Sequence, residues 1–344
     1  MTSSTTRAVS KRLLRYPDAL WPTTFALAFV VLAYLGAFAL LIRGGWIAFV
    51  PGVLLLAEAM VIAAYLTHDC AHSAVFTDGR HNERLGRLLG WVTGACYGDY
   101  ADVREKHMRH HVDRGDVIFL DFRPVIAARP ALRRTLMILE WAFVPATCLL
   151  MHVLVLVLPF TTDHFRPQRW RVIVSALVRW PVFLLLVWYA WPAALGYAVA
   201  YCLFVIVLRF MDMHQHTYEV MLTLGTDRKG PPPGFDRAYE QRNTFSNVLG
   251  HGIWANLLVL NFGYHNAHHE RPAAPWYRLP ALNRELFGGD DRQFLPFGNL
   301  VRNYARHRVA RVMVEESGDM DIGQGRDKGL GFVGVYGVSF LTAF

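Results

Sequence analysis

The chain has 344 residues, of which 53% are hydrophobic and only 18% are charged. It is more apolar than a typical soluble domain, and this composition favours an integral membrane protein. The net charge of +8 does not indicate nucleic-acid binding, because the basic residues are scattered over loops between apolar segments, without a basic stripe or a motif. Contact with anionic lipid headgroups explains them better.

The first part of the chain predicts a membrane hairpin behind a short leader. Residues 1–20 carry no cleavable-signal pattern and are interpreted as a cytoplasmic leader, with its basic residues at Arg7, Lys11, Arg12 and Arg15. Residues 22–42 and 46–67 are each long enough to cross the roughly 30 Å hydrocarbon core as a helix, and Arg43-Gly44-Gly45 predicts a tight turn between them. Glu58 lies inside the second helix, where an ionisable group is costly and therefore suspected of a function.

Two histidine clusters follow this hairpin. His68 and His72 are four residues apart, and His107, His110 and His111 have the spacing i, i+3, i+4, which places all three imidazoles on one face of a helix. Residues 85–97, between the clusters, are apolar but short and interrupted by glycine, so we expect a helix that lies in the membrane interface.

The middle of the chain contains three apolar segments: residues 136–160, 174–191 and 193–210. A single metal site needs all histidine clusters on one side of the membrane, so the number of crossings must be even. We therefore predict that 136–160, with Pro145, His152 and Pro159, is buried or re-entrant and does not cross, while the other two segments form a hairpin that turns at Trp191-Pro192. The arginine-rich flanks of 136–160 agree with cytoplasmic loops.

The last third of the chain returns to the predicted cytoplasmic side. Residues 225–243 are predicted to be a loop, and residues 243–261 are moderately apolar and predicted to be interfacial. They lead to His265, His268 and His269, which repeat the i, i+3, i+4 spacing. We divide the chain into the leader, a membrane domain over residues 21–310, and a tail of unknown role over residues 311–344, which ends in a glycine-rich apolar stretch.

Eight histidines in three clusters point to a site with more than one metal ion. Imidazole suits zinc, copper and iron, but a zinc site uses three or four ligands, and eight or nine nitrogens divide naturally between two metals. The four cysteines have neither zinc-site nor disulfide spacing, so reduced thiols are expected. No HExxH motif is present to supply the general base of a zinc hydrolase. Two iron ions acting on dioxygen fit best.

The clusters HDCAH, KHMRHH and HNAHH, in this order and interrupted by a membrane hairpin, resemble the three histidine boxes of the membrane fatty acid desaturase and hydroxylase superfamily. The resemblance covers roughly residues 20 to 290 and extends to the segments Asn261–Pro272 and Pro275–Pro280. It implies an all-α integral membrane protein with four transmembrane helices in two hairpins, interfacial helices, and a cytosolic cap that holds two irons.

The resemblance also implies the metal ligands. In that superfamily the box histidines bind the metals, together with one further histidine between the second and third boxes. The best match for this ninth ligand is His216, with His251 and then His214 as alternatives. The predicted ligands are therefore His68, His72, His107, His110, His111, His216, His265, His268 and His269.

Carboxylates beside the predicted ligands are candidates for accepting the second imidazole N–H, which would hold each ring in one tautomer. They are Asp69, Asp113, Asp116 and Asp212. Solvated loop carboxylates are an equal alternative for the same residues.

The predicted reaction is the O2-dependent introduction of a cis double bond into a fatty acyl chain or lipid. The alternative is a lipid or alkane hydroxylase or a carotenoid ketolase, because positioning of the chain decides between loss of a second hydrogen and gain of oxygen. A membrane metal transporter is less favoured, because nearly all histidines gather at one surface. Since the chain has no flavin, cytochrome or iron–sulfur motif, we expect a separate electron donor of the ferredoxin or cytochrome type with its reductase, docking on basic cytoplasmic loops.

Overall fold

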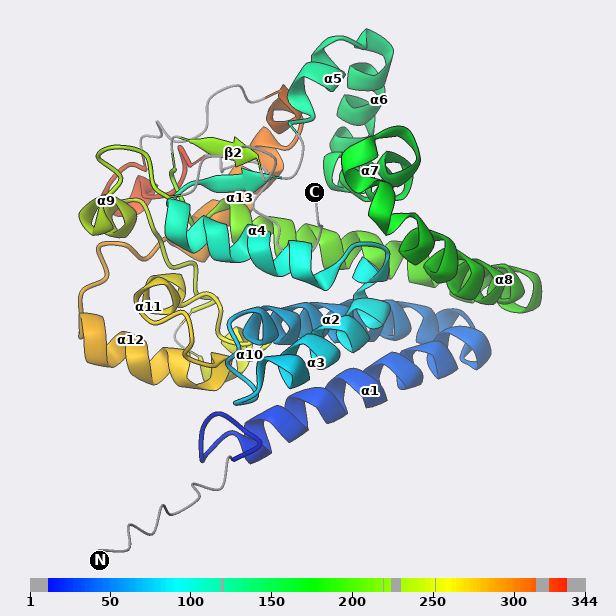
Figure 1. The fold of residues 1–344 in the computed structure, drawn as a ribbon, viewed down its shortest axis with the longest axis horizontal. Helices are drawn as coiled ribbons and strands as arrows, with labels where there is room; N and C mark the ends of the chain where they lie inside the picture. The colour runs from blue at the N-terminus through cyan, green and yellow to red at the C-terminus, as the bar shows by residue number, and fades with distance from the viewer. Residues whose placement is uncertain are drawn as a thin grey trace, which may run out of the picture.

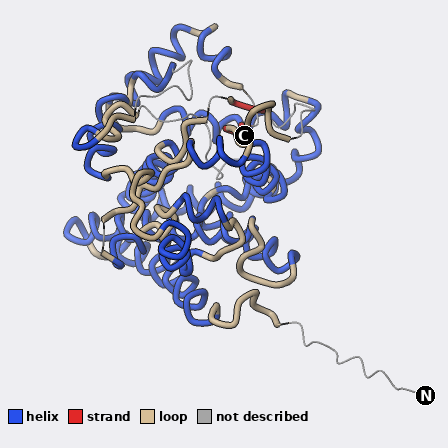
Figure 2. Tube along the Cα trace, turned by 90° about the vertical axis from the view of Figure 1, so that its left-hand side faces the viewer, coloured by secondary structure: helices blue, strands red, loops and turns tan. Residues whose placement is uncertain are grey.

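The computed structural model describes residues 12–118, 121–218, 220–223, 230–250, 252–313 and 322–332. These residues are mainly helical, and Figure 1 shows long helices on one side of the molecule and shorter helices with connecting loops on the other. Figure 2, turned by 90°, shows the same prevalence of helix over strand. The sequence prediction of a mostly helical protein is confirmed.

Helices α1 (Leu20–Arg43) and α2 (Gly45–Ala71) form the first hairpin and lie side by side in Figure 1. The buried face of α1 is built largely from small residues that recur every three or four positions, which lets the two backbones approach closely: Thr23, Ala26, Val30, Ala33, Ala37 and Leu41. The turn requires glycine twice, because a Cβ at Gly44 would lie 2.1 Å from the Ala48 Cβ and Gly45 has a φ of +61°. The second half of α2 is buried throughout.

Helix α3 (Gly79–Thr93) lies between the first two histidine clusters and begins six residues before the apolar segment that predicts it. Asp78 caps its first turn by accepting a hydrogen bond from the backbone N–H of Arg80, and Gly94 ends it in the left-handed conformation. The 3₁₀ helix η1 (Ala95–Tyr97) joins it to α4 (Tyr100–Asp113), which is capped by Asp99. Strand β1 (Asp116–Ile118) then pairs in parallel with β2 (Met221–Thr223).

The predicted single segment 136–160 is two helices in the structure, which is a correction. After α5 (Arg123–Ala127), helix α6 (Pro130–Trp141) ends before Phe143, whose φ is +60°, and α7 (Ala146–Thr161) begins after Pro145. A left-handed residue and a proline two positions later cannot continue a helix. Helix α7 has 16 residues, about 24 Å, and this is shorter than the hydrocarbon core of a bilayer.

Helix α8 (Arg169–Met213) follows the 3₁₀ helix η2 (Asp163–Gln168) and bends sharply at Ala190, which has non-helical torsion angles two residues before Pro192. The guanidinium of Arg179 donates to the hydroxyl of Tyr197 at 2.7 Å. In a straight helix these residues would be about 27 Å apart, so the two halves of α8 run back along each other.

The described residues contain three helices that are long and apolar enough to cross a membrane, α1, α2 and the continuous segment Asp163–Met213. The sequence predicts four such helices. The numbers differ because the last two predicted spans are the two halves of the bent α8.

The segment after α8 carries short elements. The predicted loop 225–243 contains α9 (Arg237–Arg242), which the sequence prediction missed although Asp236 caps it by accepting from the N–H of Tyr239. Among the described residues of the stretch 243–261, only α10 (Ile253–Leu257) is helical. The remaining elements are α11 (His265–Glu270), η3 (Trp276–Arg278), α12 (Leu279–Phe287), α13 (Phe297–His307), η4 (Ala310–Met313) and η5 (Gly325–Asp327).

The two ends of the described chain pack on the body of the protein. In the predicted leader, Leu14 forms an antiparallel bridge with Phe76, just after the first histidine cluster. Asn303 of α13 donates to the carbonyl oxygens of Gly329 and Leu330 in the tail. The described part of the tail ends at Phe332, which is buried. Arg7 and Lys11 of the leader and residues 314–321 and 333–344 of the tail lie outside the described residues.

Candidate metal centre

The first two histidine clusters lie at the ends of long helices. His68 lies in the last turn of α2, and His72 is the residue at which that helix ends. His107, His110 and His111 occupy the last two turns of α4, and all three are buried. The helical spacing predicted from the sequence therefore places both sets of imidazoles at the junction of α2 and α4.

The third cluster forms most of the short helix α11, and His216 joins it from the segment that follows α8. His216 forms an antiparallel bridge with Thr244. The backbone just before α11 approaches another segment closely, because a Cβ at Gly263 would lie 3.0 Å from the Cα of Val248. Glycine at this position therefore lets α11 lie against the rest of the site.

The nine predicted ligands lie together in two groups, and within each group the ligand atoms are all within 4.8 Å of one another. One group has five members: His68, His72, His107, His111 and His268. The other has four members: His110, His216, His265 and His269. Each group combines residues from at least three separate parts of the chain.

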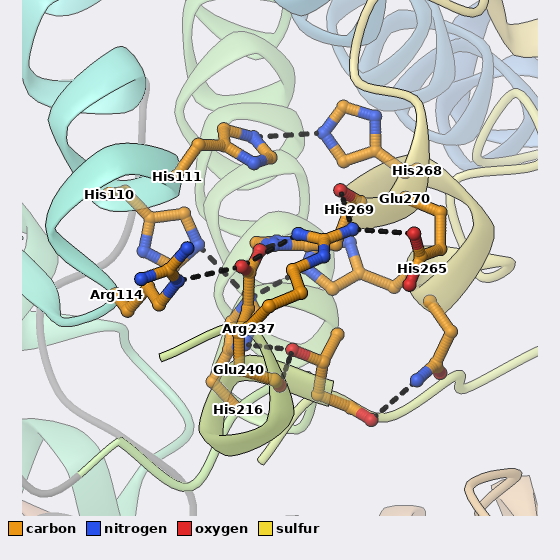
Figure 3. Close-up of polar contacts among 12 residues, drawn as sticks. His110, His111, Arg114, His216, Arg237, Glu240, His265, His268, His269 and Glu270 are labelled. Atoms are coloured by element: carbon orange, nitrogen blue, oxygen red, sulfur yellow. Dashed lines mark hydrogen bonds and ion pairs between the residues drawn. The ribbon is translucent and has the colours of Figure 1, made fainter. Parts of the chain in front are cut away.

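The Nε2 atoms within each group face one another at short distances. In the group of five, the distances are 2.7 Å for His72–His107, 3.3 Å for His107–His111 and 3.1 Å for His111–His268. In the group of four, they are 3.0 Å for His110–His216 and 2.7 Å for His216–His265. Figure 3 shows six of the nine rings, from α4, α11 and the segment of His216: His110, His111, His216, His265, His268 and His269.

This spacing fits metal ligation. Imidazole nitrogens bind a first-row metal at about 2.0–2.1 Å, so two ligands in tetrahedral or octahedral positions around one ion lie about 3 Å apart. The observed distances of 2.7–3.3 Å match this separation. Two Nε2 atoms can form a hydrogen bond only when one of them carries a proton. If the five contacts were all hydrogen bonds, each contact would need a proton on one of its two nitrogens.

Burial keeps these imidazoles in the neutral form that binds metal. Desolvation is the largest cause of the lowered pKa of each ring. The pKa of His110 is lowered to about 4. The pKa is lowered well below the usual value for four others: His107, His216, His265 and His269. Neighbouring imidazoles lower several of these pKa values further. The site therefore offers uncharged nitrogen donors at neutral pH.

Comparison with protein-family models matches residues 44–300 to the family described as fatty acid desaturase. The match covers three quarters of the chain and all three histidine clusters. The chain belongs to the fatty acid desaturase family. Comparison with curated proteins finds no match. Membership of this family confirms the resemblance seen in the sequence and implies that the protein is an oxidoreductase. Family membership and the three apolar helices together indicate an integral membrane protein.

In this desaturase-family protein, Glu240 of α9 supports the group of four. Its Oε1 lies 3.0 Å from the Nδ1 of His269, which leaves the Nε2 of that ring to face the site. Arg114 and Arg237 both donate to the other oxygen of Glu240, at 3.0 Å and 2.7 Å. Figure 3 shows Glu240 between these two arginines. A carboxylate held in this way fixes the tautomer and orientation of a ligating imidazole.

Other rings of the site are oriented by neutral acceptors. The Nδ1 of His110 lies 3.0 Å from the carbonyl oxygen of Gly115, and the Nδ1 of His216 lies 3.3 Å from the hydroxyl of Thr244. Both interactions leave Nε2 as the nitrogen that faces the other ligands, in agreement with the short Nε2 distances.

The carboxylates expected from the sequence to support the histidines do not do so among the described residues. Asp69 accepts a hydrogen bond from the N–H of Trp276, and Asp113 accepts from Arg109 and from the N–H of Gly230. Asp116 is buried, Asp212 is half-buried with a buried Oδ2, and neither has a hydrogen bond to a histidine among the described residues. Asp69 shows why proximity in sequence misled: it follows His68 directly on α2, and adjacent residues on a helix do not share a face. Glu240, which does support a ligand, has no distinguishing signal in the sequence.

The two alternatives to His216 differ in what the structure says of them. His214 points elsewhere, because its Nδ1 lies 2.8 Å from the carbonyl oxygen of Phe210 and its ring packs 5.6 Å from that of Phe332. His251 lies outside the described residues. Glu58 is half-buried ten residues before His68 on α2, about 15 Å along the helix, and the structure does not bring it to the site.

A small cavity of about 20 Å³ lies between the two histidine groups. It is lined by two members of each group, His68, His107, His110 and His265, and by Tyr65, Asp212, Gln215 and Phe262. The ring of Phe262 stacks on Tyr65 at 4.8 Å and contacts His68 at 4.4 Å. The space between the groups is thus bounded by both aromatic and polar side chains.

Proposed function

We propose that this protein is a membrane-bound di-iron fatty acyl desaturase. The observation that carries the proposal is the convergence of nine buried imidazole nitrogens into two adjacent groups with a small cavity between them. Two groups of this composition match two metal ions. Imidazole suits iron as well as zinc and copper, and family membership favours iron among them.

The group of five would hold one iron and the group of four the other. When bound, two irons supplied with O2 and two electrons provide an oxidant strong enough to remove hydrogen from an unactivated methylene. The balanced reaction converts a –CH2–CH2– unit, O2, two electrons and two protons into a –CH=CH– unit and two molecules of water.

The residues of the chain determine which methylene reaches the site and keep water out of it. Tyr65 and Phe262 give the small cavity an apolar wall, and Asp212 and Gln215 give it a polar one. The Oδ2 atom of Asp212 is buried without a hydrogen-bond partner, so it can accept a hydrogen bond from a group bound in this cavity. Precise placement of the substrate against the metals by such walls is the main source of selectivity in this class of chemistry.

Two larger cavities lie among the helices of the proposed membrane spans. The larger has a volume of about 990 Å³ and the smaller about 440 Å³, and both are lined by Trp91, Ala95 and Gly98. The smaller cavity also reaches Thr67, the residue before His68. Mostly apolar walls of this kind suit an alkyl chain, and their position favours a substrate that enters from the bilayer.

We further propose four membrane crossings, with α1, α2 and the two halves of α8 as the spans and the metal centre on the cytoplasmic side. The sharp bend of α8 at Ala190 supports this arrangement. A cysteine-specific reagent that cannot cross the membrane should label a cysteine placed at Trp191 from outside intact cells and one placed at Arg237 only after permeabilisation. Labelling of both from the same side would contradict the proposal.

The electrons would come from a separate ferredoxin- or cytochrome-type protein and its reductase. Support for this comes from the absence of redox-cofactor motifs in the sequence and from the basic residues of the predicted cytoplasmic loops, which favour an acidic carrier.

The experiment that tests the function combines metal analysis with product analysis. We expect about two irons per chain in the detergent-purified protein, and new unsaturated acyl chains in cells that express it with a donor system. Both should be lost in a His110→Ala variant. Products that gain one oxygen, instead of losing two hydrogens, would establish the hydroxylase alternative; zinc alone would contradict the di-iron proposal.

A further inference from the structure

Arg179 is a charged residue inside an apolar helix. It lies five residues after the start of the predicted span 174–191, about 7.5 Å along the first half of α8 within the hydrocarbon core. A cation at this depth is costly, and such residues usually face an internal cavity or a binding site.

The contacts of Arg179 are all with neutral groups. Its guanidinium donates to the carbonyl oxygen of Trp91 at 2.6 Å and to the hydroxyl of Tyr197 at 2.7 Å, and it lies 3.9 Å from the sulfur of Cys96. Among the described residues no carboxylate pairs with it, whereas the buried Arg209 has one. The positive charge at this place is therefore not balanced by the protein.

The guanidinium forms part of the wall of the 990 Å³ cavity. Most of the remaining wall is aliphatic or aromatic, including Phe38, Val153, Leu186 and Trp188. Trp188 is 84% exposed on the outer surface of the helices, so this side of the cavity faces the surrounding lipid. A volume of 990 Å³ is at the upper end of the range for pockets that hold one small molecule, and this favours one alkyl chain over a two-chain lipid.

Tyrosine hydroxyls surround the charge. The Tyr197 hydroxyl accepts a hydrogen bond from Arg179, so its own O–H remains to be donated. Tyr34 and Tyr97 also line the cavity, and both are close enough to interact electrostatically with Arg179. A planar guanidinium together with hydroxyl donors is a suitable set for a carboxylate, which an arginine can bind through two parallel hydrogen bonds.

We propose that Arg179 and Tyr197 bind the carboxylate of a free long-chain fatty acid whose alkyl chain lies in this cavity. The proposal deepens the desaturase function, on which it rests, by naming the substrate as the unesterified acid. Trp91, Ala95 and Gly98 line both this cavity and the smaller one, and the smaller one is also lined by Thr67, the residue before His68.

Binding can be measured without turnover. The iron-loaded protein is placed in nanodiscs of uncharged phosphatidylcholine, without an electron donor, and titrated with radiolabelled stearate and, separately, with octadecanol of the same chain length. We expect stearate to bind at least about tenfold more tightly than octadecanol, because a charge-assisted bond is present only for the acid. Arg179→Gln should weaken stearate binding about tenfold and leave octadecanol binding unchanged, and Arg179→Lys should be intermediate.

The matched control is Arg169→Gln, which removes the same charge from the same helix at a residue that lines neither cavity. It should bind both ligands as the unaltered protein does. If Arg179→Gln does not fold, because the contact with Trp91 at the end of α3 is lost, the unaltered protein still decides the question. It should prefer stearate over octadecyltrimethylammonium of equal chain length.

Three results would overturn the proposal. The first is equal binding of stearate and octadecanol, and the second is undiminished stearate binding by a folded Arg179→Gln variant. The third is displacement of stearate by an equal concentration of phosphatidylglycerol, which would identify a two-chain lipid as the occupant. Product analysis on the same samples keeps the two proposals apart. Double-bond formation without a preference for the acid contradicts only the role of Arg179, whereas acid binding without oxidation contradicts only the desaturase function.

Discussion

At the scale of single residues, His214 and His216 offer a direct test of the ligand set. They are two residues apart, but only His216 lies within ligand distance of His110 and His265, while His214 binds the backbone of Phe210. We expect His216→Ala to reduce the iron content from about two to about one per chain and to abolish product formation. His214→Ala should keep both irons; loss of iron in both variants, or in neither, would contradict the assignment. Metal analysis of purified protein measures this.

Glu240 allows a second test, with a matched control on the same network. Glu240→Gln removes the carboxylate that orients His269, and losses of such partners typically reduce metal affinity or activity 10- to 100-fold. Glu270→Gln removes a nearby carboxylate whose one ion pair among the described residues is with Arg237 at 2.7 Å, and it should change metal affinity less than twofold. Competition with a chelator measures both affinities, and equal effects would show that Glu240 acts only as a general structural charge.

The residues of the site were predictable from the sequence to the extent that helical spacing defines them. The i, i+3, i+4 and i, i+4 patterns place eight imidazoles on helical faces without any tertiary information. His216 follows the end of α8, and Glu240 lies on the six-residue helix α9, so the position of each at the site depends on long-range packing. This is why the sequence left His214 and His251 open and did not single out Glu240.

At the scale of helices, the buried ion pair between Arg209 and Glu140 connects α8 to α6. The two side chains lie 2.6 Å apart, and Glu140 also accepts from the backbone and hydroxyl of Thr147 at the start of α7. Glu140→Ala leaves a buried cation and should lower the free energy of unfolding by about 3–5 kcal/mol. The double variant Glu140→Leu/Arg209→Met should recover most of the lost free energy of unfolding. Denaturation in detergent measures this, and a single-variant loss below 1 kcal/mol would contradict a connecting role.

The helices themselves were predictable where apolar length or a capping residue defines them. The first hairpin follows directly from two apolar stretches and a Gly-Gly turn. The division of 136–160 into α6 and α7 was not predicted, because the composition is apolar on both sides and only the left-handed Phe143 beside Pro145 ends the helix. Helix α9 was missed because six residues are too few to show periodicity.

At the scale of the whole molecule, burial of the histidines predicts a specific dependence of stability on pH. The pKa of His110 is lowered to about 4 and that of His72 to about 3, chiefly by desolvation, so the unfolded chain binds protons at a higher pH than the folded one. This stabilising term is complete above the unfolded pKa of about 6.5 and is lost as the pH falls toward 4 and below. For metal-free protein we expect a constant unfolding temperature above about pH 7 and a steep decline below pH 6.5. A flat profile between pH 5 and 7 would contradict this.

The wide separation of the ligands along the chain has a consequence for how the protein is made. The pair His72–His107 is 35 residues apart, but His111 and His268 are 157 residues apart, and both metal groups require residues from α11. A nascent chain that has emerged only as far as α10 therefore holds an incomplete ligand set for each metal group. A metal ion bound by either group gains its full ligand set only after α11 has been synthesised, and it would tie the first third of the chain to the last third as a cross-link does.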